Sequence, residues 1–225
     1  MSPPNPTPAD AHAGPRPGQF TAMISSTALD LPEHRKLVHQ ACLDAEVFPV
    51  GMEQLPARDA TGVAASLEMV DKADIYIGVY AFRYGWVPDG EEVSITEMEF
   101  DRAVERKVEG KLREILVFAA HEQHAFPAGH IEANEVAQDK LRKFKARAAA
   151  VRVRKEFKSA EELHRLVLQA LNEFKNRQQR AADSTTAARP ARTSIPNNLP
   201  RLQPFFGRED ELAQIREALD PENRT

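Results

Sequence analysis

The segment from residue 74 to residue 99 constrains the fold of this chain more than any other. It opens with the run Ile75–Tyr80 (IYIGVY), which is rich in β-branched and aromatic residues and predicts a strand buried on both faces. A polar loop with Arg83-Tyr84-Gly85-Trp86 follows, and Ser94 and Glu97 then have the spacing of a capping box. In such a box Ser94 caps a helix and the Glu97 side chain reaches back to the Ser94 N–H. In open α/β sheets ligands bind where a strand leads through a loop to a helix.

Further apolar segments extend this unit into an alternating series. We expect strands at 19–25, 47–53, 114–120 and 151–157, and helices at 30–45, 60–72, 132–149 and 159–180, besides the helix that starts at Ser94. Asp30 and Glu33 are spaced as a second capping box. Strands that alternate with helices predict a parallel sheet, here a five-stranded sheet with helices on both faces, a flavodoxin-like three-layer sandwich.

Composition excludes several function classes. The 225 residues include 42% hydrophobic and 28% charged residues, and the net charge of −4 gives no sign of a nucleic-acid or membrane partner. The single cysteine, Cys42, excludes an internal disulfide and is typical of a reducing compartment, so we expect a cytoplasmic protein. We expect no cofactor and no metal site, because His121, His124 and His130 lack the tight spacing of a metal centre and are interpreted as solvated loop residues.

Domain boundaries follow from changes in composition. Residues 1–18 hold six prolines and are interpreted as a disordered leader, and residues 19–181 as the α/β domain. Residues 182–200 are polar and contain proline, as linkers do. Residues 201–225 form a turn and a short amphipathic helix, which we interpret as the start of a truncated further domain.

Several motifs occur in an order that resembles a known family. They are Ile24-Ser25-Ser26-Thr27, Leu31 with Glu33 and Arg35, Phe48-Pro49-Val50-Gly51-Met52-Glu53, Asp74-Ile75-Tyr76-Ile77, Arg83-Tyr84-Gly85 and Ser94-Ile95-Thr96-Glu97-Met98-Glu99-Phe100. Together they resemble domain-of-unknown-function family 4062, which is similar to TIR domains and nucleoside deoxyribosyltransferases. The resemblance implies a TIR-like domain at the N-terminus of a signal-transducing NTPase. Phe206 to Leu212 also resembles the F-x-G-R-x-x-E-L leader of such NTPases.

The resemblance implies a site at the carboxyl ends of the strands. In deoxyribosyltransferases a helical Glu, followed four residues later by Ala, attacks the sugar, and Glu99 with Ala103 keeps that spacing. Glu99 is therefore the first catalytic candidate and Glu97 the second, although a first-turn carboxylate is also favoured by the helix dipole alone. The candidate substrate-binding residues are Ser25, Ser26, Thr27, Glu53, Arg83 and Tyr84.

Each of these binding residues also has a purely structural interpretation. Arg83 could pair with Glu53 instead of a phosphate, and Tyr84 could cover the end of the sheet instead of stacking on a base. The hydroxyls of residues 25–27 could cap their loop. Two functions stay open: cleavage of an N-glycosidic bond of NAD or a nucleotide, and a non-catalytic module that couples the state of the NTPase to self-association.

Overall fold

A computed structural model describes residues 14–27, 30–51, 62–151 and 155–187. The chain divides into two compact units, Met1–Ala181 and Ala182–Thr225, and the first contains the sheet. Within the described residues this sheet has five strands, β1 (Thr21–Ser26), β2 (Phe48–Val50), β3 (Ile75–Tyr80), β4 (Glu114–Ala120) and β5 (Lys155–Phe157). All neighbouring strands are parallel and their order is β2-β1-β3-β4-β5, which confirms the predicted flavodoxin-like fold.

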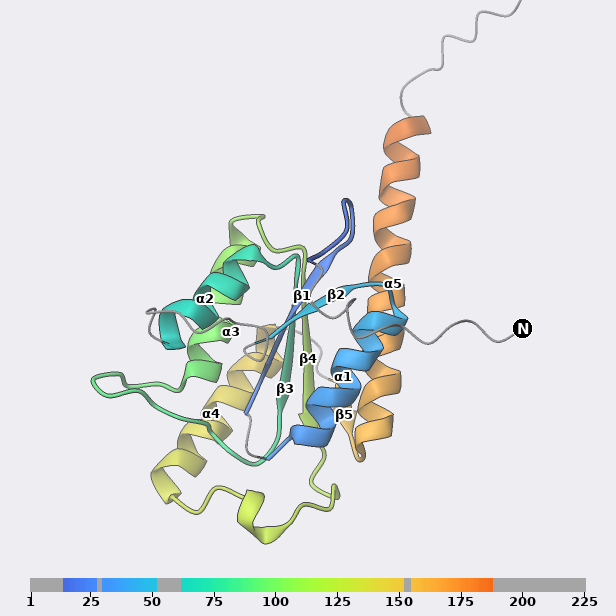
Figure 1. Cartoon of the computed structure of the whole chain (residues 1–225). Coiled ribbons are helices and arrows are strands. Elements are labelled where there is room, and N and C mark those ends of the chain that lie inside the picture. The colour runs from blue at the N-terminus through green and yellow to red at the C-terminus, as the bar shows by residue number, and fades with distance from the viewer. Residues whose placement is uncertain (1–13, 28–29, 52–61, 152–154, 188–225) are drawn as a thin grey trace, which may run out of the picture. The chain divides into compact units, whose positions relative to one another are not determined.

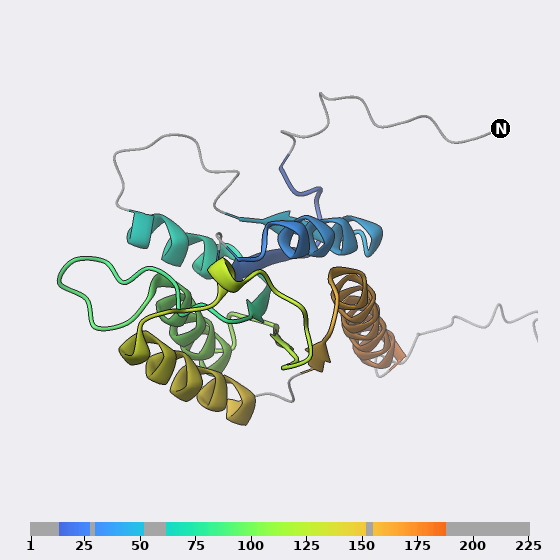
Figure 2. The same cartoon turned by 90° about the horizontal axis from the view of Figure 1, so that it is seen from below.

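Helices cover both faces of the sheet (Figures 1 and 2). They are α1 (Pro32–Asp44), α2 (Gly62–Lys72), α3 (Ile95–Val108), α4 (Glu135–Val151) and α5 (Ala160–Ala187), with a short 3₁₀ helix η3 (Ala128–His130) after β4. One apolar core lies between the sheet and helices α1 and α5, and a second lies between the opposite face and helices α2, α3 and α4. The structure is therefore a three-layer sandwich, because each face of the sheet has its own layer of helices.

Strand β3 occupies the centre of the sheet, and all six of its residues are buried. Successive side chains alternate between the two cores: Ile75, Ile77 and Val79 face α1 and α5, and Tyr76 and Tyr80 face α2, α3 and α4. A strand covered on both faces has no solvated side, which explains its unbroken apolar sequence.

The structure confirms half of one predicted capping box and none of the other. In helix α3 the Ser94 side chain accepts from the Glu97 N–H, as expected. The Ser94 N–H, however, donates to the Tyr84 hydroxyl and not to the Glu97 side chain. In α1 the N-cap is Leu31, which makes no side-chain cap, and Pro32 starts the helix. The predicted Asp30–Glu33 capping box is therefore wrong.

The structure also moves three predicted boundaries. Helix α4 continues to Val151, so the Val-Arg alternation from that residue does not start a strand, and β5 is limited to Lys155–Phe157 in the described part of the chain. Helix α5 runs to Ala187, so the first residues of the predicted linker are helical. Among the described residues, none of the helices has the length and apolar character needed to cross a bilayer.

Candidate functional site

A cleft of about 820 Å³ opens at the carboxyl ends of β1 and β3, where the chain order reverses across the sheet. Its walls come from the loop after β1, the loop after β3, the start of α3 and the segment from Glu132 to Lys140. Five of the predicted site residues line it: Ser26, Thr27, Arg83, Tyr84 and Glu99. Connections from neighbouring strands β1 and β3 leave in opposite directions at this point, which opens a crevice for a ligand.

Glu99 lies at the base of the cleft and is almost completely buried, with 4% of its surface exposed. The Ser25 hydroxyl donates to Glu99 Oε2 at 2.5 Å, whereas the Ser66 hydroxyl of α2 donates to the Val63 carbonyl at 3.0 Å. Burial raises the pKa of Glu99 to about 7, while the Ser25 hydrogen bond, the charge of Arg35 and the nearby Ser66 hydroxyl oppose the rise. A carboxyl group that titrates near neutral pH in a cleft is a recognised mark of a functional site.

Glu97 has a different position, because it is not among the residues that line the cleft. Its carboxylate accepts one hydrogen bond from the Tyr84 hydroxyl and another from Arg147 of α4. Arg147 also pairs with Asp101, and its guanidinium lies over the Phe144 ring. These contacts tie the loop after β3 to α3 and α4, so Glu97 holds the cleft wall together.

Tyr84 is buried within the wall of the cleft. Its hydroxyl is used inside the protein by Glu97 and Ser94, and only 2% of the residue is exposed. Burial and the hydrogen bond to Glu97 raise the pKa of Tyr84 to about 12. The ring nevertheless contributes to the cleft wall, with Lys140 Nζ at 5.9 Å from its centroid.

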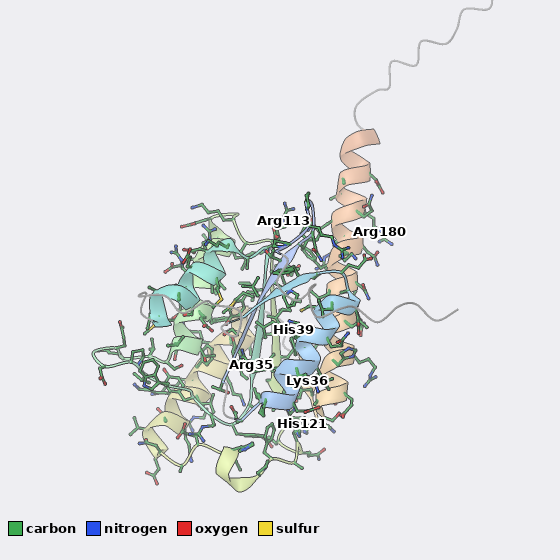
Figure 3. The ribbon with its side chains drawn as sticks, viewed as in Figure 1. Arg35, Lys36, His39, Arg113, His121 and Arg180 are labelled. Atoms are coloured by element: carbon green, nitrogen blue, oxygen red, sulfur yellow. The ribbon has the colours of Figure 1, made fainter. Side chains whose placement is uncertain are left out.

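The loop after β1 contributes hydroxyls that the protein itself engages. The Thr27 hydroxyl donates to Asp30, and Arg35 of α1 donates to the Ser26 hydroxyl at 2.6 Å and to the Ser26 carbonyl at 3.0 Å. Figure 3 shows Arg35 and His121 toward the end of the molecule where the strands finish, with Arg113 at the other end. Because Asp30 is only 2% exposed, burial raises its pKa, and this is opposed mainly by the Thr27 hydrogen bond.

The loop after β3 brings a cation and an aromatic ring to the cleft. Arg83 donates to the Gly129 carbonyl at 3.2 Å, and Trp86 lies at the cleft with 66% of its surface exposed. Gly85 between them has a φ of 93°, which favours glycine, and an added Cβ would lie 3.1 Å from the Thr27 side chain. Glycine therefore lets the loop turn tightly against the end of β1.

Several lining residues were not predicted from the sequence. Glu132, Asn134 and Lys140 come from the segment after β4, and Lys140 donates to the Glu92 carbonyl at 2.5 Å. The sequence does not single out Lys140, because a run of charged residues gives no signal of which side chain turns towards a cleft. Glu53, the remaining predicted binding residue, lies outside the described residues, and so does its suggested pairing with Arg83.

The interpretation of the histidines as solvated loop residues is wrong for His124. Its Nε2 lies 2.7 Å from Nε2 of His34 on α1, and both rings pack against Phe126 and Phe157. Burial, followed by the charge of His124, lowers the pKa of His34 to about 4. Groups of three or more His, Cys, Asp or Glu that could hold a metal ion are absent from the described residues.

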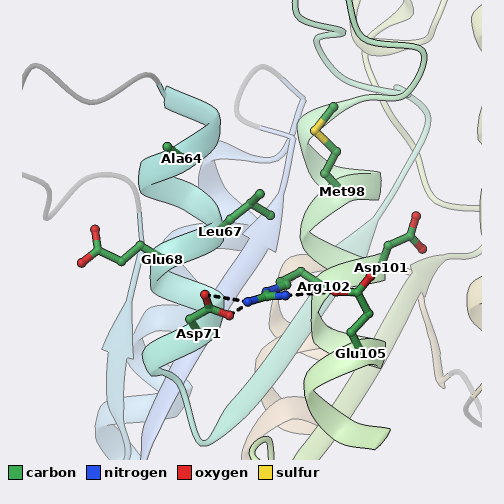
Figure 4. Close-up of a pocket in the computed structure, with 8 residues that line it drawn as sticks. All are labelled: Ala64, Leu67, Glu68, Asp71, Met98, Asp101, Arg102 and Glu105. Atoms are coloured by element: carbon green, nitrogen blue, oxygen red, sulfur yellow. Dashed lines mark hydrogen bonds and ion pairs between the residues drawn. The ribbon is translucent and has the colours of Figure 1, made fainter. Parts of the chain in front are cut away.

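A second hollow, of about 450 Å³, lies between α2 and α3 (Figure 4). Arg102 reaches across it to Asp71 with two hydrogen bonds, Nε to Oδ1 at 2.7 Å and Nη2 to Oδ2 at 3.0 Å. This fork-to-fork pair joins the two helices. Its lining residues include none of the predicted site residues, so the carboxyl-end cleft is the candidate site.

Comparisons with known proteins give one family match. The model of the family described as "Domain of unknown function (DUF4062)" matches residues 21–172. The TIR domains of the activated Roq1 resistosome, which directly recognises the pathogen effector XopQ, are 12% identical with a TM-score of 0.47, covering 68% of this chain and 99% of that one. A flavodoxin from the domain Archaea is 8% identical with a TM-score of 0.32, covering 69% of this chain and 97% of that one. No curated protein matches the chain. Because the family model covers more than half of the residues, the chain belongs to the family of domains of unknown function DUF4062.

Proposed function

We propose that this domain binds a nucleotide in the carboxyl-end cleft and cleaves its N-glycosidic bond, with NAD as the first substrate to test. The observation that carries the proposal is Glu99, a buried carboxyl group at the cleft whose pKa is raised to about 7 by burial. At an anomeric carbon a carboxylate acts as a nucleophile or stabilises an oxocarbenium ion.

The other lining residues fit the parts of a nucleotide. Arg83 and Lys140 supply two cations for phosphate oxygens, and the exposed Trp86 ring offers a stacking face for a base. Glu132 and Asn134 add hydrogen-bonding groups to the same cleft. Apolar, aromatic and charged groups in one cleft of this size suit a ligand with a base, a sugar and a phosphate.

The proposed reaction breaks the bond between the sugar C1′ and the base nitrogen, and the bonding electrons leave with the base. Ionised Glu99 stabilises the positive charge that develops on C1′, and water then adds to that carbon and releases a proton. A positively charged pyridinium base departs as a neutral molecule and needs no protonation, whereas a neutral purine needs an acid. This difference favours NAD over an unactivated nucleoside.

The resemblance of the sequence to the N-terminal parts of signal-transducing NTPases suggests how the activity is used. In this proposal the domain is a TIR-like effector that acts in the cytoplasm in signalling or defence. Self-association through an NTPase region activates it. The residues that resemble the NTPase leader, 206–212, lie outside the described part of the chain.

The experiment compares wild-type protein with two glutamine variants of the same helix. Full-length protein is incubated with NAD, NADP or free nucleosides at pH 8, and released base is separated and quantified. Glu99→Gln keeps the shape of the side chain and removes its charge, so we expect the rate to fall about 100-fold or more. Glu105→Gln, at a side chain with 62% exposure on the same helix, is expected to leave the rate unchanged.

Equal rates for wild type and Glu99→Gln would contradict the catalytic role, and intact substrates after long incubation would contradict the enzyme function altogether. The rival is a non-catalytic interaction module, and one observation favours it. Trp86, Ile131 and Val136 are large apolar residues with 66%, 47% and 67% exposure, a kind of exposure found at protein interfaces. This rival predicts self-association that survives Glu99→Gln and is lost when Val136 becomes Asp.

A further inference from the structure

The segment between β4 and α4, residues 121–134, runs across the carboxyl end of the sheet and is called the strap below (Figure 2). All of its residues are described, and apart from η3 it has no helix or strand. Near its end the Glu132 N–H donates to the Phe82 carbonyl at 2.8 Å, and Glu132 and Asn134 line the cleft. The position of this cleft wall therefore depends on the contacts that hold the strap.

Nearer its start, the strap is attached to α1 by a pair of histidines. Nε2 of His124 lies 2.7 Å from Nε2 of His34, which is 8% exposed. Aromatic rings surround the pair: the His124 ring centroid is 4.2 Å from that of Phe126, and the His34 centroid is 5.4 Å from that of Phe157. The strap is thus joined to α1 by one polar contact inside an apolar cluster.

Counting hydrogens shows that this contact needs two neutral rings. The space between the two Nε2 atoms holds one hydrogen, so one ring donates and the other accepts. Nδ1 of His124 is buried without a hydrogen-bond partner in the described part of the chain, so the pair avoids an orphaned N–H only when His124 donates from Nε2. An added proton then either gives His124 Nδ1 a hydrogen without an acceptor or places a second hydrogen between the two Nε2 atoms.

We propose that His34 and His124 form a pH-sensitive clasp, closed while both rings are neutral, that holds the strap across the end of the sheet. By holding the strap, the clasp sets the cleft wall formed by Glu132 and Asn134. The two histidines do not line the cleft themselves, so they are positioning residues. Only their effect on a bound nucleotide rests on the function proposed above; the clasp itself does not depend on it.

The charged groups around the pair leave burial as the main influence on it. Glu161 of α5 favours the charged form of both rings, but its side chain is exposed and water screens its charge. Charged residues close to the pair in the sequence engage other groups: Arg35 of α1 with Ser26, His121 of the strap with Glu156 of β5, and Lys158 with Gln123.

The effect of pH follows from the difference between the closed and the open strap. Burial lowers the pKa of His34 from 6.5 to about 4, and it also lowers the pKa of His124. In an open strap the rings meet water and regain their ordinary pKa, so they take up protons between pH 6.5 and about 4. Acid therefore favours the open strap. For His34 alone, this linkage raises the ratio of open to closed strap by about 20-fold between pH 7 and pH 5.

The test measures opening of the strap in the full chain by amide hydrogen exchange, followed by NMR from pH 7 to pH 5. The amides of His124 and Glu132 are the reporters, because both donate within the closed structure. Exchange rates are converted to protection factors, which correct for the pH dependence of exchange itself. In the wild type we expect both protection factors to fall by about 10-fold or more at pH 5, while those of β3 stay high.

The decisive variant combines His34→Phe with His124→Phe, which keeps two rings in the aromatic cluster and removes both titrating groups. Its strap is expected to have the same protection at pH 7 and pH 5. His164→Gln is the matched control, because His164 pairs with Asp44 outside the strap, and it is expected to behave as the wild type does. Wild-type protection that is constant with pH, or lost equally in the double variant, would overturn the proposal.

A second measurement tests the clasp even if the double variant does not fold. Nitrogen-15 chemical shifts of the two imidazole rings report which ring nitrogens carry hydrogen. At pH 7 we expect a hydrogen on Nε2 of His124 and none on Nε2 of His34. Hydrogens on both Nε2 atoms, or on neither, would mean that the rings do not share a hydrogen bond, and the proposal would fail.

The cleft supplies a further readout, which separates the clasp from the proposed function. In Glu99→Gln, where NAD is expected to stay intact, a nucleotide bound against Glu132 favours the closed strap, so saturating NAD is expected to raise the Glu132 protection factor at pH 5. Acid-dependent protection in a protein that neither binds nor cleaves nucleotide supports the clasp and refutes the proposed function. Glu99-dependent cleavage with protection that is constant with pH refutes the clasp and leaves the enzyme function in place.

Discussion

Glu99→Gln is expected to stabilise the folded protein, and to do so more at pH 8 than at pH 5. Burial raises the pKa of Glu99 from 4.5 to about 7, so the folded state holds a proton that the unfolded chain releases between these values. The contribution of Glu99 to folding stability is therefore greatest below pH 4.5 and is lost as the pH rises through the folded pKa. A pKa shift of this size lowers the free energy of unfolding by about 3 kcal/mol at pH values above both pKa values, relative to pH values below both.

Between pH 5 and pH 8 the titration of Glu99 is expected to lower the free energy of unfolding of the wild type by about 2.5 kcal/mol. The glutamine variant lacks this titrating group and does not show this decrease. Any hydrogen bond that Gln makes poorly with Ser25 lowers the stability of the variant by a similar amount at both pH values, so it does not affect this difference. For a domain of this size the difference corresponds to about 5 to 10 °C in Tm.

Urea unfolding of wild type and Glu99→Gln, measured at pH 5, 6, 7 and 8, checks this expectation. Glu105→Gln is the control for the substitution itself, because it replaces an exposed carboxylate on the same helix. If the stability difference between wild type and Glu99→Gln is constant from pH 5 to pH 8, Glu99 does not titrate as a buried group, and the reasoning fails.

Three further predictions concern the packing and the mouth of the cleft. Gly78→Ala places a Cβ 2.3 Å from the Tyr80 hydroxyl oxygen, and we expect it to lower the free energy of unfolding by about 1 to 3 kcal/mol in urea titrations. Unchanged stability would mean that the Tyr76 and Tyr80 hydroxyls do not meet over this glycine. Arg147→Ala leaves the largely buried Glu97 without its ion pair and is expected to cost about 1 to 3 kcal/mol, and restoration by the double variant with Glu97→Gln would identify the unpaired charge as the cause. Trp86, the single tryptophan of the chain, is expected to lose fluorescence when a nucleotide stacks on it, and emission that NAD leaves unchanged at saturating concentration would contradict stacking.

The sequence alone was sufficient to predict most of the fold. Apolar runs of strand length that alternate with helical periodicity predict a parallel sheet covered on both faces, and β3 and β4 have the bounds that their sequences indicate. Strands β2 and β5, at the two edges of the sheet, comprise three residues each within the described part of the chain and are shorter than predicted. At an edge the neighbouring strand, and not the local sequence, decides how many residues pair.

The residues that line the cleft were predictable in part for the same reason. Residues that directly follow parallel strands gather at one edge, so Ser26, Thr27 and Arg83 could be placed together from their order alone. Tertiary contacts then decide which of these side chains are available to a ligand and which are bound within the protein. Glu97 has the spacing to cap its own helix, but Tyr84 and Arg147, which are distant in the sequence, bind its carboxylate instead.

The sequence by itself determined the strand and helix order, the edge of the sheet that holds the candidate site and the helix that carries Glu99. Only the tertiary structure decided the environment of that carboxyl group. Local patterns record which residues are apolar, but the free energy of a charge depends on everything within a few ångströms of it, including groups from other elements. For Glu99 those groups are Ser25 on β1, Ser66 on α2 and Arg35 on α1, which no spacing along the chain brings together.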